Sequence, residues 1–290
     1  GWGTVIKEAA VEIEAARSRG VDVAADMYPY TAGGSGLEAT IPSWAFDGGM
    51  DSVRARIGRD DVRDRMKGEL VTGYEGWWNI VEAAGGWDGV VLVNARNDEN
   101  AHFEGKSITQ IAQEWGKDPA DAAWDLVAAG QGRVMAIYHM MSEEDVKWAL
   151  QRPWTSIGSD AGAALTPGSA DVLGLPHPRS YGTFPRVLGK YVRDEQVLTL
   201  AEAVRKMPSW PATRMRLDRR GVIREGAWAD ITIFDLDRVS DQATYDEPVL
   251  FPVGIEYVLV NGEVVIEDGG THTGARPGHV LYGPGKGSNR

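Results

Sequence analysis

The hydrophobic pattern at the N-terminal end of the chain predicts a helix followed by a strand. Within residues 4–19, apolar residues recur every three or four positions with charged residues between them, which is the spacing of an amphipathic helix. Gly20 ends this helix, and residues 21–30 (VDVAADMYPY) predict a strand that residues 31–36 (TAGGSG) leave as a loop. A helix, a glycine and a strand in succession are typical of an α/β unit.

Residues 37–94 have a mixed pattern that we interpret as an insertion. They contain a charged helical segment (51–70), a segment rich in Gly and Trp (73–89) and an apolar strand (90–94, VVLVN). Two helical segments follow, at 107–115 and at 119–129. Asp118 can cap the second of these, and Pro119 stands at its first position.

The strand and helix order returns in the middle of the chain. Residues 133–140 (RVMAIYHM) predict a strand, Ser142 caps a helix that runs to Leu150, and residues 155–159 predict another strand. Asp160 follows this last strand directly. We therefore expect an acidic side chain at the C-terminal end of a strand.

The pattern of predicted elements changes after Arg219. Before it, residues 161–183 predict a loop, and residues 184–193 and 200–207 predict helices. After it, short segments rich in Val and Ile alternate with turn pairs such as Asn261 with Gly262 and Gly269 with Gly270, which is typical of an antiparallel sheet. The predicted strands of this small β domain are 221–226, 229–235, 255–260 and 263–267.

Length, composition and charge exclude several function classes. The 290 residues suit one large domain or two ordinary ones. They carry 30 basic and 42 acidic side chains, a net charge of −12, which argues against nucleic-acid or anionic lipid partners. Without cysteine there is no disulfide, thiolate nucleophile or iron–sulfur cluster. No apolar run of about 20 residues and no leader is visible, so we expect a cytoplasmic chain that does not bind a membrane.

Asp160 is the strongest candidate for an active-site residue. In parallel α/β barrels the active site lies at the C-terminal ends of the strands, so an acid there can meet ligands from other strands. A role as a helix cap or as a loop-ordering residue is the alternative. Tyr28 and Tyr30 flank Pro29 at another strand end, where small residues leave room for a ligand; a tight structural turn explains them equally well.

Two further segments offer weaker candidates. His177 and Arg179 are positioned to hydrogen-bond a carboxylate substrate, although packing of His177 and a surface ion pair of Arg179 are the alternative. The strand end at Tyr138 and Met141 combines an aromatic ring with a soft apolar side chain, which by pattern is more often core than pocket. His102 and His272 have no partner at metal-binding spacing, so no metal site is evident from this chain alone.

Seven segments, in order, resemble the N-acyl-D-amino-acid deacylases (D-aminoacylases). They are DMYPYTAGGSG (26–36), GKSITQIAQEWGKDPADAAWDLV (105–127), MSEEDV (141–146), IGSDA (157–161), PHPRSYGTFPRVLGKYVRDE (176–195), GVIREGAWADITIFD (221–235) and HTGARPGHVL (272–281). This family belongs to the amidohydrolase superfamily. The resemblance implies a metal-bearing (β/α)8 barrel with a small β-sandwich.

The resemblance also implies roles for individual residues. Asp160 corresponds to the acid at the end of the last barrel strand, which contacts the metal and passes a proton from the attacking water to the leaving amine. Tyr138 and Met141 correspond to the pocket for the acyl or side-chain group. Tyr28 or Tyr30 together with Ser35 corresponds to the substrate-recognition loop.

The family's other metal ligands, two of them in a His-x-His motif, lie upstream of the first residue of this chain. The resemblance thus implies that residues 1–215 form the C-terminal part of the barrel, with an insertion at about 37–130 that covers the site. Residues 216–283 then form the small β-sandwich, and we expect 284–290 to be a disordered tail. Zinc, held mostly by ligands outside this chain, and an N-terminal amidohydrolase chain or segment that completes the barrel are the implied cofactor and partner.

The leading hypothesis is therefore zinc-dependent hydrolysis of N-acyl-D-amino acids to a carboxylate and a D-amino acid, with no activity in the absence of the N-terminal portion. One alternative is an amidohydrolase for a cyclic amide, a carbamate or a small peptide, because related enzymes differ mainly in their loops. Another is a non-catalytic fragment or binding subunit whose interaction surface is the Trp-rich insertion.

Overall fold

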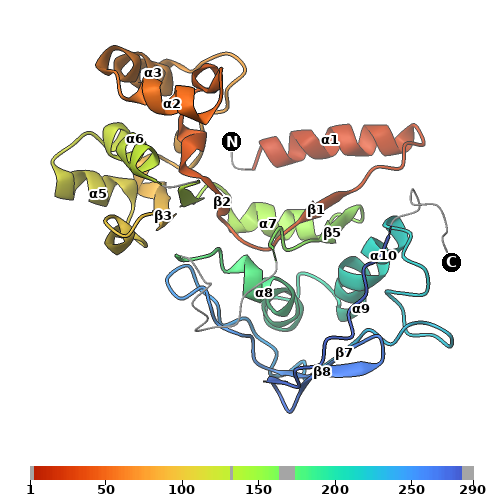
Figure 1. The fold of residues 1–290 in the computed structure, drawn as a ribbon. Coiled ribbons are helices and arrows are strands. Elements are labelled where there is room, and N and C mark those ends of the chain that lie inside the picture. Colours follow the sequence, from red (N-terminus) through yellow and green to blue (C-terminus); the bar gives the residue numbers. More distant parts are fainter. Residues whose placement is uncertain (1–2, 131–132, 163–173, 283–290) are drawn as a thin grey trace.

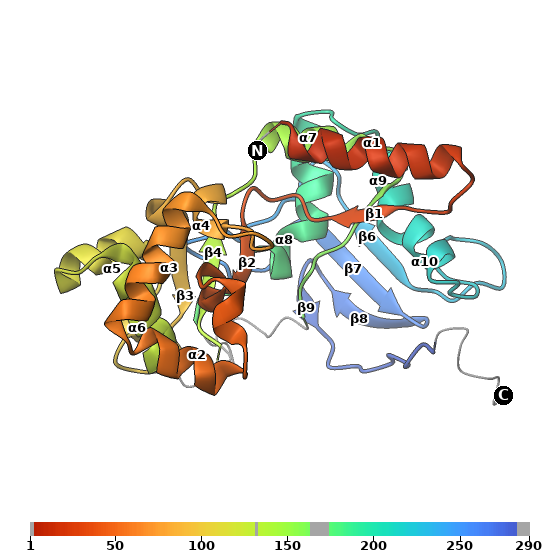
Figure 2. The same ribbon diagram turned by 90° about the horizontal axis from the view of Figure 1, so that it is seen from above.

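The computed structural model describes residues 3–130, 133–162 and 174–282. The helices are α1 (Val5–Ser18), α2 (Met50–Ile57), α3 (Asp60–Thr72), α4 (Ile80–Ala83), α5 (Ile108–Trp115), α6 (Pro119–Ala129), α7 (Glu143–Leu150), α8 (Arg179–Arg186), α9 (Leu200–Val204) and α10 (Trp210–Arg214). The strands are β1 (Ala25–Met27), β2 (Gly33–Gly36), β3 (Val90–Asn94), β4 (Met135–Tyr138), β5 (Thr155–Ile157), β6 (Ile231–Phe234), β7 (Ile255–Val260), β8 (Glu263–Glu267) and β9 (Thr271–His272). Figure 2 shows them in two lobes, with α2–α6 and β2–β4 in one and the rest in the other.

The lobe of α2–α6 is built around its own apolar core. Buried side chains from Leu37 to Tyr138 form one cluster, with Trp124, Leu92 and Ile108 completely buried. The helices of this lobe begin where the sequence predicts. Ser107 caps α5, and Asp118 caps α6 with Pro119 in its first turn.

Residues 33–36 form strand β2, so the loop predicted for them is wrong. β2 pairs antiparallel with β4, with Gly33 opposite Tyr138. A Cβ atom at Gly33 would lie 2.7 Å from Met140 Cε, so glycine at this position allows close packing. Tertiary contacts therefore outweigh the poor strand propensity of the segment.

Strand β4 was predicted within 133–140, but its partners differ from those that the strand, helix, strand order suggests. β4 is the central strand of an antiparallel sheet, between β2 and β3, whereas β5 pairs in parallel with β1. Val90, Leu92 and Ala136 are completely buried in this sheet, so pairing β3 with β4 removes two apolar strands from water. The compact unit thus extends beyond the predicted insertion at 37–130, to β2 on one side and β4 on the other.

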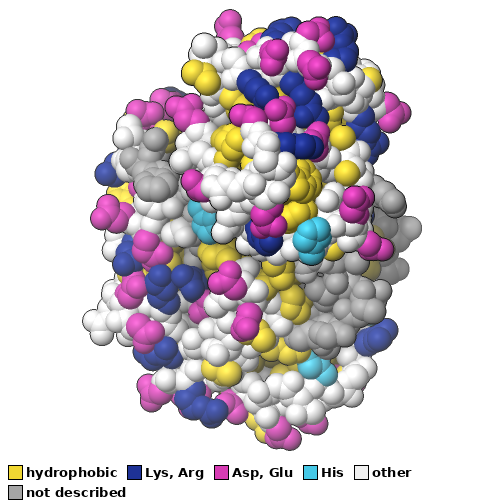
Figure 3. All heavy atoms as spheres, turned by 90° about the vertical axis from the view of Figure 1, so that its left-hand side faces the viewer, with side chains coloured by type: hydrophobic (Ala, Val, Ile, Leu, Met, Phe, Trp, Pro, Cys, Tyr) yellow, Lys and Arg dark blue, Asp and Glu magenta, His cyan; other side chains and the backbone are white. Residues whose placement is uncertain are grey.

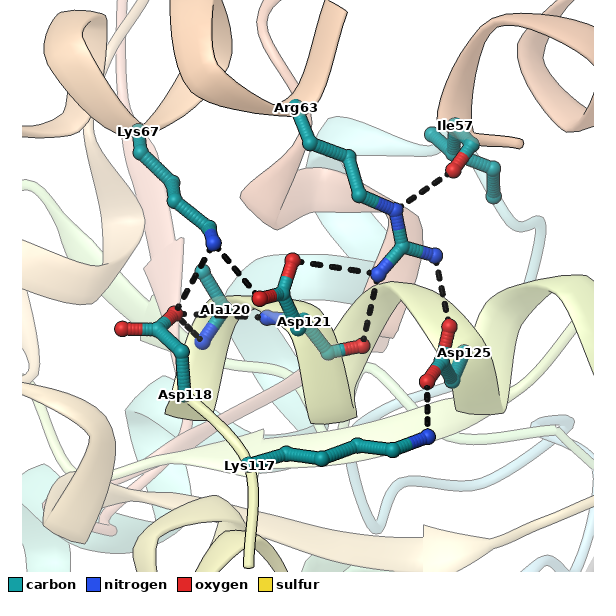
Figure 4. A network of polar contacts seen from close by, with 8 residues as sticks. All are labelled: Ile57, Arg63, Lys67, Lys117, Asp118, Ala120, Asp121 and Asp125. Atoms are coloured by element: carbon teal, nitrogen blue, oxygen red, sulfur yellow. Dashed lines mark hydrogen bonds and ion pairs between the residues drawn. The ribbon is translucent and has the colours of Figure 1, made fainter. Parts of the chain in front are cut away.

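The charged segment predicted as one helix over 51–70 forms two, because Gly58, a poor helix former, stands at the break between α2 and α3. Helix α3 is tied to α6 by the ion pairs shown in Figure 4. Arg63 Nη1 lies 3.1 Å from Asp121 Oδ1, and its Nη2 lies 2.5 Å from Asp125 Oδ1. Burial disfavours the charged form of Asp125, but hydrogen bonds from Lys117 and Arg63 outweigh it and hold the pKa of this carboxyl below its ordinary value.

We expect Arg63→Met to lower the free energy of unfolding by about 2 kcal/mol, because it removes charge-assisted hydrogen bonds at a partly buried site. The side chain of Arg63 is only 16% exposed. Its Nε also donates to the carbonyl oxygen of Ile57 at 2.6 Å, so the substitution leaves that acceptor and two carboxylates without this donor. Urea unfolding, followed by circular dichroism, measures the change.

Arg59→Met is the matched control for that measurement. Arg59 pairs with Asp61 at 2.6 Å, but the two side chains are 64% and 68% exposed, and such pairs contribute about 1 kcal/mol at most. Equal losses for both variants would show that the buried network does not hold α3 on α6.

The second lobe contains the parallel pair β1 and β5. Figure 1 shows this pair between α1 on one side and α8 and α9 on the other. Helix α1 confirms the helix predicted at 4–19, and Ser142 caps α7 as expected. Of the strand predicted over 21–30, only β1 is paired. Helix α8 begins at Arg179, inside the predicted loop, and continues as a π-helix to Asp194.

Lys206 is completely buried beside the start of β5. Its ammonium donates hydrogen bonds to the carbonyl oxygens of Arg152 and Thr155, and Glu202 lies 3.6 Å away. Burial lowers the pKa of this lysine. Because Thr155 is the first residue of β5, Lys206 fixes the strand that leads to Asp160.

The C-terminal part forms one antiparallel sheet in the order β6, β7, β8, β9. The predicted turn at Asn261 and Gly262 is confirmed by their positive φ values of 52° and 88°. The strand predicted at 221–226 is wrong: these residues form a bend, an irregular stretch and a turn, and a Cβ at Gly221 would lie 2.5 Å from Ala212 Cβ. A second sheet to complete a sandwich is not among the described residues, and the predicted tail at 284–290 lies outside them.

The face of the molecule that includes the lobe of α2–α6 carries charged side chains of both signs. Figure 3 shows basic and acidic side chains intermixed toward the top of this face, with apolar side chains gathered near its middle. Of the helices within the described residues, none is both long enough and apolar enough to span a bilayer.

Candidate active site

The parallel pairing of β1 and β5 brings two of the predicted residues to one edge. Met27 lies opposite Ile157, and the backbone N–H of Gly158 donates to Met27 O at 3.0 Å. Tyr28 follows β1 directly, and Asp160 lies three residues beyond β5. This is the edge at which parallel α/β proteins place their ligands.

Asp160 forms an ion pair with Arg179 at this edge. The distance from Asp160 Oδ2 to Arg179 Nη2 is 2.9 Å. The carboxylate side chain remains 69% exposed, so it is accessible from outside the chain. The backbone of Asp160 has a φ of 47°, a left-handed conformation that Asp and Asn tolerate better than other residues with a Cβ.

Arg179 is held by Tyr28, His177 and Asp160, yet one of its nitrogens has no hydrogen-bond partner among the described residues. Its guanidinium carbon lies 4.6 Å from the centre of the Tyr28 ring, and its backbone N–H donates to His177 Nδ1 at 3.0 Å. The side chain is only 11% exposed. Among the described residues, nothing accepts a hydrogen bond from the buried Nη1. A buried guanidinium nitrogen in this state is suited to bind a carboxylate.

His177 is buried, and both of its ring nitrogens contact backbone groups. Nδ1 accepts from Arg179 N, so Nε2 carries the proton and donates to Ala32 O at 2.8 Å. Burial lowers the pKa of His177 to about 4, and the positive charge of Arg179 acts in the same direction. The ring is therefore neutral at pH 7, and the structure brings it to Arg179 but not to the exposed edge.

We expect His177 to lower the free energy of unfolding by about 3 kcal/mol as the pH falls from 6.5 to 4. In this interval the folded chain holds the ring neutral, whereas the unfolded chain binds a proton at an ordinary histidine pKa. The free energy of unfolding therefore falls as the pH is lowered through this window and is unaffected by this group above it. Urea unfolding at several pH values measures the slope.

His177→Gln provides the comparison, because it removes the titrating ring and leaves the carboxylates in place. The difference between the wild-type and variant curves is expected to change only between pH 4 and 6.5. Parallel curves across this window would contradict the assignment of a buried neutral histidine.

Tyr30 lies behind His177. It is 3% exposed, and its ring centre is 5.3 Å from that of His177 in an edge-on contact. The guanidinium of Arg186 lies over the Tyr30 ring, 4.8 Å from its centre, and burial raises the pKa of the Tyr30 hydroxyl. Tyr30 therefore forms part of the wall that supports His177, while Tyr28 is the tyrosine next to Arg179.

Ser35 and Tyr138 lie away from this edge, in the sheet of the other lobe. Ser35 Oγ accepts a hydrogen bond from Arg133 Nη2 at 3.3 Å. Tyr138 is completely buried, and its hydroxyl donates to Gly36 O at 2.8 Å. Among the described residues, Tyr138 is part of the apolar core of that lobe.

A cavity of about 960 Å³ opens beside Tyr28 and Met141. Its walls come from α1, β1, α7 and the segment around Trp78, and they are mostly apolar. Asp26, Glu82 and Asp145 are its acidic lining residues, and none of its lining residues is basic. Of the predicted site residues, only Tyr28 and Met141 line it.

The site also contains residues that the sequence did not indicate. The Tyr245 ring centre lies 5.4 Å from that of His177 and 5.1 Å from that of His139. Tyr245 stands in a segment without regular structure, so no periodic pattern marks it. Asp26 of β1 accepts a hydrogen bond from Ser156 of β5; its place two residues before Tyr28 was the only available signal.

Comparison with known proteins agrees with this geometry. The model of the amidohydrolase family matches residues 118–266, which include Asp160, His177 and Arg179. The chain belongs to the amidohydrolase family.

Individual amidohydrolases are similar over most of the chain. An N-acyl-D-glutamate deacylase from Alcaligenes xylosoxydans xylosoxydans is 37% identical over 282 residues, or 97% of this chain and 45% of that protein. A D-aminoacylase from the same organism is 40% identical over 179 residues, covering 62% of this chain and 34% of that protein. The predicted resemblance to the N-acyl-D-amino-acid deacylases is thus confirmed. The chain spans less than half the length of these relatives.

Solved structures of this amidohydrolase group share its α/β fold. The crystal structure of N-acyl-D-glutamate deacylase from Bordetella bronchiseptica, with zinc and a phosphonate inhibitor, has a TM-score of 0.67 and 32% identity over 91% of this chain and 44% of that one. A crystal structure of D-aminoacylase gives a TM-score of 0.66 and 32% identity over 94% and 45% of the two chains.

The described part of this amidohydrolase does not complete a metal site. No group of three or more His, Asp or Glu side chains within it is placed to hold a metal ion. Asp160 is exposed and accessible, so it can supply one oxygen to a site whose other ligands come from elsewhere. A single carboxylate does not suffice for zinc, which takes three or four protein ligands.

Proposed function

We propose that this chain is the C-terminal part of a zinc-dependent N-acyl-D-amino-acid deacylase, which hydrolyses the amide bond to give a carboxylate and a D-amino acid. The observation that carries the proposal is the ion pair of Asp160 with Arg179, whose buried Nη1 has no acceptor among the described residues. An exposed acid beside a partly free guanidinium supplies both a proton carrier and a carboxylate anchor. The deacylases named above support the substrate class.

Asp160 is the proposed proton carrier. Its Oδ2 is engaged by Arg179, which leaves Oδ1 to take a proton from the water that attacks the amide carbon. The same carboxyl then donates that proton to the amide nitrogen as the C–N bond breaks, so the products are an acid and an amine. The exposure of the side chain gives a substrate direct access to it.

Arg179 is the proposed anchor for the substrate carboxylate. A carboxylate that approaches Nη1 replaces the missing acceptor with a charge-assisted hydrogen bond. The guanidinium lies over the Tyr28 ring, 4.6 Å from its centre. Because Nη2 already binds Asp160, one planar side chain sets the distance between the substrate carboxylate and the proton carrier.

The apolar cavity is the proposed place for an uncharged group of the substrate. Tyr28 and Met141 line it, and its acidic lining residues disfavour a second carboxylate there. Ser35 and Tyr138 remain predictions from the family comparison, and neither is among the residues that line the cavity.

Zinc and an N-terminal segment complete the proposed enzyme. A bound zinc ion would supply Lewis-acid polarisation of the amide carbonyl. Asp160 is the ligand that this chain would contribute, through the second lone pair of the Oδ2 that already pairs with Arg179. We propose that residues 1–215 are the C-terminal part of an eight-stranded barrel. The open edges of β1 and β5 then receive the strands of the N-terminal segment, and the sheet of β6–β9 receives the second layer of a sandwich.

Co-expression tests the proposal. The chain is produced with the N-terminal segment of the D-aminoacylase from Alcaligenes xylosoxydans xylosoxydans, and the complex is assayed for zinc and for hydrolysis of N-acetyl-D- and N-acetyl-L-amino acids. We expect a stable complex with zinc that hydrolyses the D-substrates, and no hydrolysis by the chain alone. A complex that binds zinc but cleaves only cyclic amides, carbamates or small peptides would overturn the substrate class, and a zinc-free inactive complex would overturn the enzyme.

A further inference from the structure

His177 joins the crossing from β1 to β2 to the start of helix α8 through two hydrogen bonds of its ring. Its Nε2 donates to Ala32 O at 2.8 Å, in the crossing from β1 to β2. Its Nδ1 accepts from Arg179 N at 3.0 Å, at the first residue of α8. Only the neutral ring with a proton on Nε2 can make both bonds at once.

The surroundings of the ring restrict it to this orientation. Tyr28, Tyr30 and Tyr245 lie around it, with ring centres 5.8, 5.3 and 5.4 Å away. A Cβ atom at Gly34 would lie 3.7 Å from His177 Cδ2, so β2 passes directly beside it. With 8% of its surface exposed, the imidazole has no room to turn toward a substrate.

We propose that His177 is a positioning residue for Arg179 and does not contact the substrate. This inference rests on the proposed function, because it concerns the carboxylate anchor of the same site. The hydrogen bond to Arg179 N fixes where the side chain of Arg179 begins, and Tyr28 and Asp160 fix where it ends. His177 thereby sets the place of the Nη1 that binds the substrate carboxylate.

Two variants separate the two hydrogen bonds. In His177→Asn, the short amide can occupy the place of Nδ1 and accept from Arg179 N, but it does not reach Ala32 O. In His177→Gln, the longer amide can reach Ala32 O but does not replace Nδ1. A residue needed only for packing gives no reason for these variants to differ in substrate preference.

The test compares two substrates in the complex of this chain with its N-terminal segment. One is an N-acetyl-D-amino acid, and the other is its carboxamide, which lacks the charge that Arg179 binds. For His177→Gln we expect kcat/KM for the acid to fall about tenfold more than kcat/KM for the carboxamide, the loss that corresponds to one hydrogen bond. His177→Asn should keep most of the wild-type preference for the acid. His102→Gln, on the exposed surface of the other lobe, is the control and should change neither value.

Equal losses for both substrates, or the same preference in both variants, would overturn the positioning role even if the enzyme is a deacylase. A second measurement does not depend on activity. In the 290-residue chain, exchange of the Arg179 amide hydrogen should be faster in His177→Gln than in the wild type and close to the wild type in His177→Asn. Unchanged exchange in His177→Gln would contradict the inference, whatever reaction the enzyme performs.

Discussion

Asp160→Asn is expected to lower kcat of the assembled enzyme by about 10²–10⁴-fold, the usual contribution of a general acid–base group. The carboxamide cannot take a proton from the attacking water at neutral pH, so both proton transfers assigned to Asp160 are lost. The backbone should not change, because Asn tolerates the left-handed φ of 47° as well as Asp does. Steady-state kinetics with an N-acetyl-D-amino acid measure the loss.

Asp268→Asn is the matched control. Asp268 also has a left-handed backbone, with a φ of 50°, but it lies in the turn between β8 and β9, far along the chain from Asp160. Both variants should melt close to the wild-type temperature, and only Asp160→Asn should lose activity. An Asp160→Asn enzyme within about twofold of wild type would exclude Asp160 as the proton carrier, since proton transfer contributes at least 10².

Features fixed by neighbouring residues were predictable from the sequence. The caps at Ser107, Asp118 and Ser142 each accept hydrogen bonds from backbone N–H groups two or three residues later, so a short window contains the whole interaction. Strand β3 was predicted at its observed bounds because its apolar run is buried.

Features fixed by distant partners were not predictable. β2 is a strand because β4, about a hundred residues later, pairs with it, and its glycines favour a loop by themselves. The order of strands 133–140 and 155–159 suggested a parallel unit, whereas burial of β3 against β4 placed them in different sheets. Sequence spacing carries no information on such pairing.

The candidate site likewise contains residues that the sequence indicates and features that depend on distant partners. Tyr28 and Asp160 stand beside strand ends, His177 precedes α8 and Arg179 begins it. The fold brings these four residues together. Among the described residues, Arg179 has a buried nitrogen without an acceptor, Nη1. His177 has none, because its Nε2 donates to Ala32 O. This difference gives the two residues different proposed roles. Tyr245 reaches the site from an irregular segment, so only coordinates identify it.

Arg179→Gln is expected to lower kcat/KM for an N-acetyl-D-amino acid by about 30- to 900-fold, which corresponds to the loss of about 2–4 kcal/mol from a buried charged hydrogen bond to the substrate carboxylate. Most of the loss should appear in KM, because the carboxylate is bound before and during the reaction. The carboxamide substrate, which has no charge for Arg179 to bind, should lose much less. Kinetics with both substrates, at saturating zinc, measure the difference.

Arg219→Gln is the control for removing an arginine of this kind. Arg219 also lies over an aromatic ring, 5.6 Å from the centre of Trp228, and pairs with a carboxylate, Asp218 at 3.1 Å. It is 52% exposed and lies in the C-terminal part of the chain, so its loss should leave both substrates unaffected. Equal losses for the acid and the carboxamide in Arg179→Gln would mean that Arg179 serves only to orient Asp160, because an effect on the proton carrier slows every amide alike.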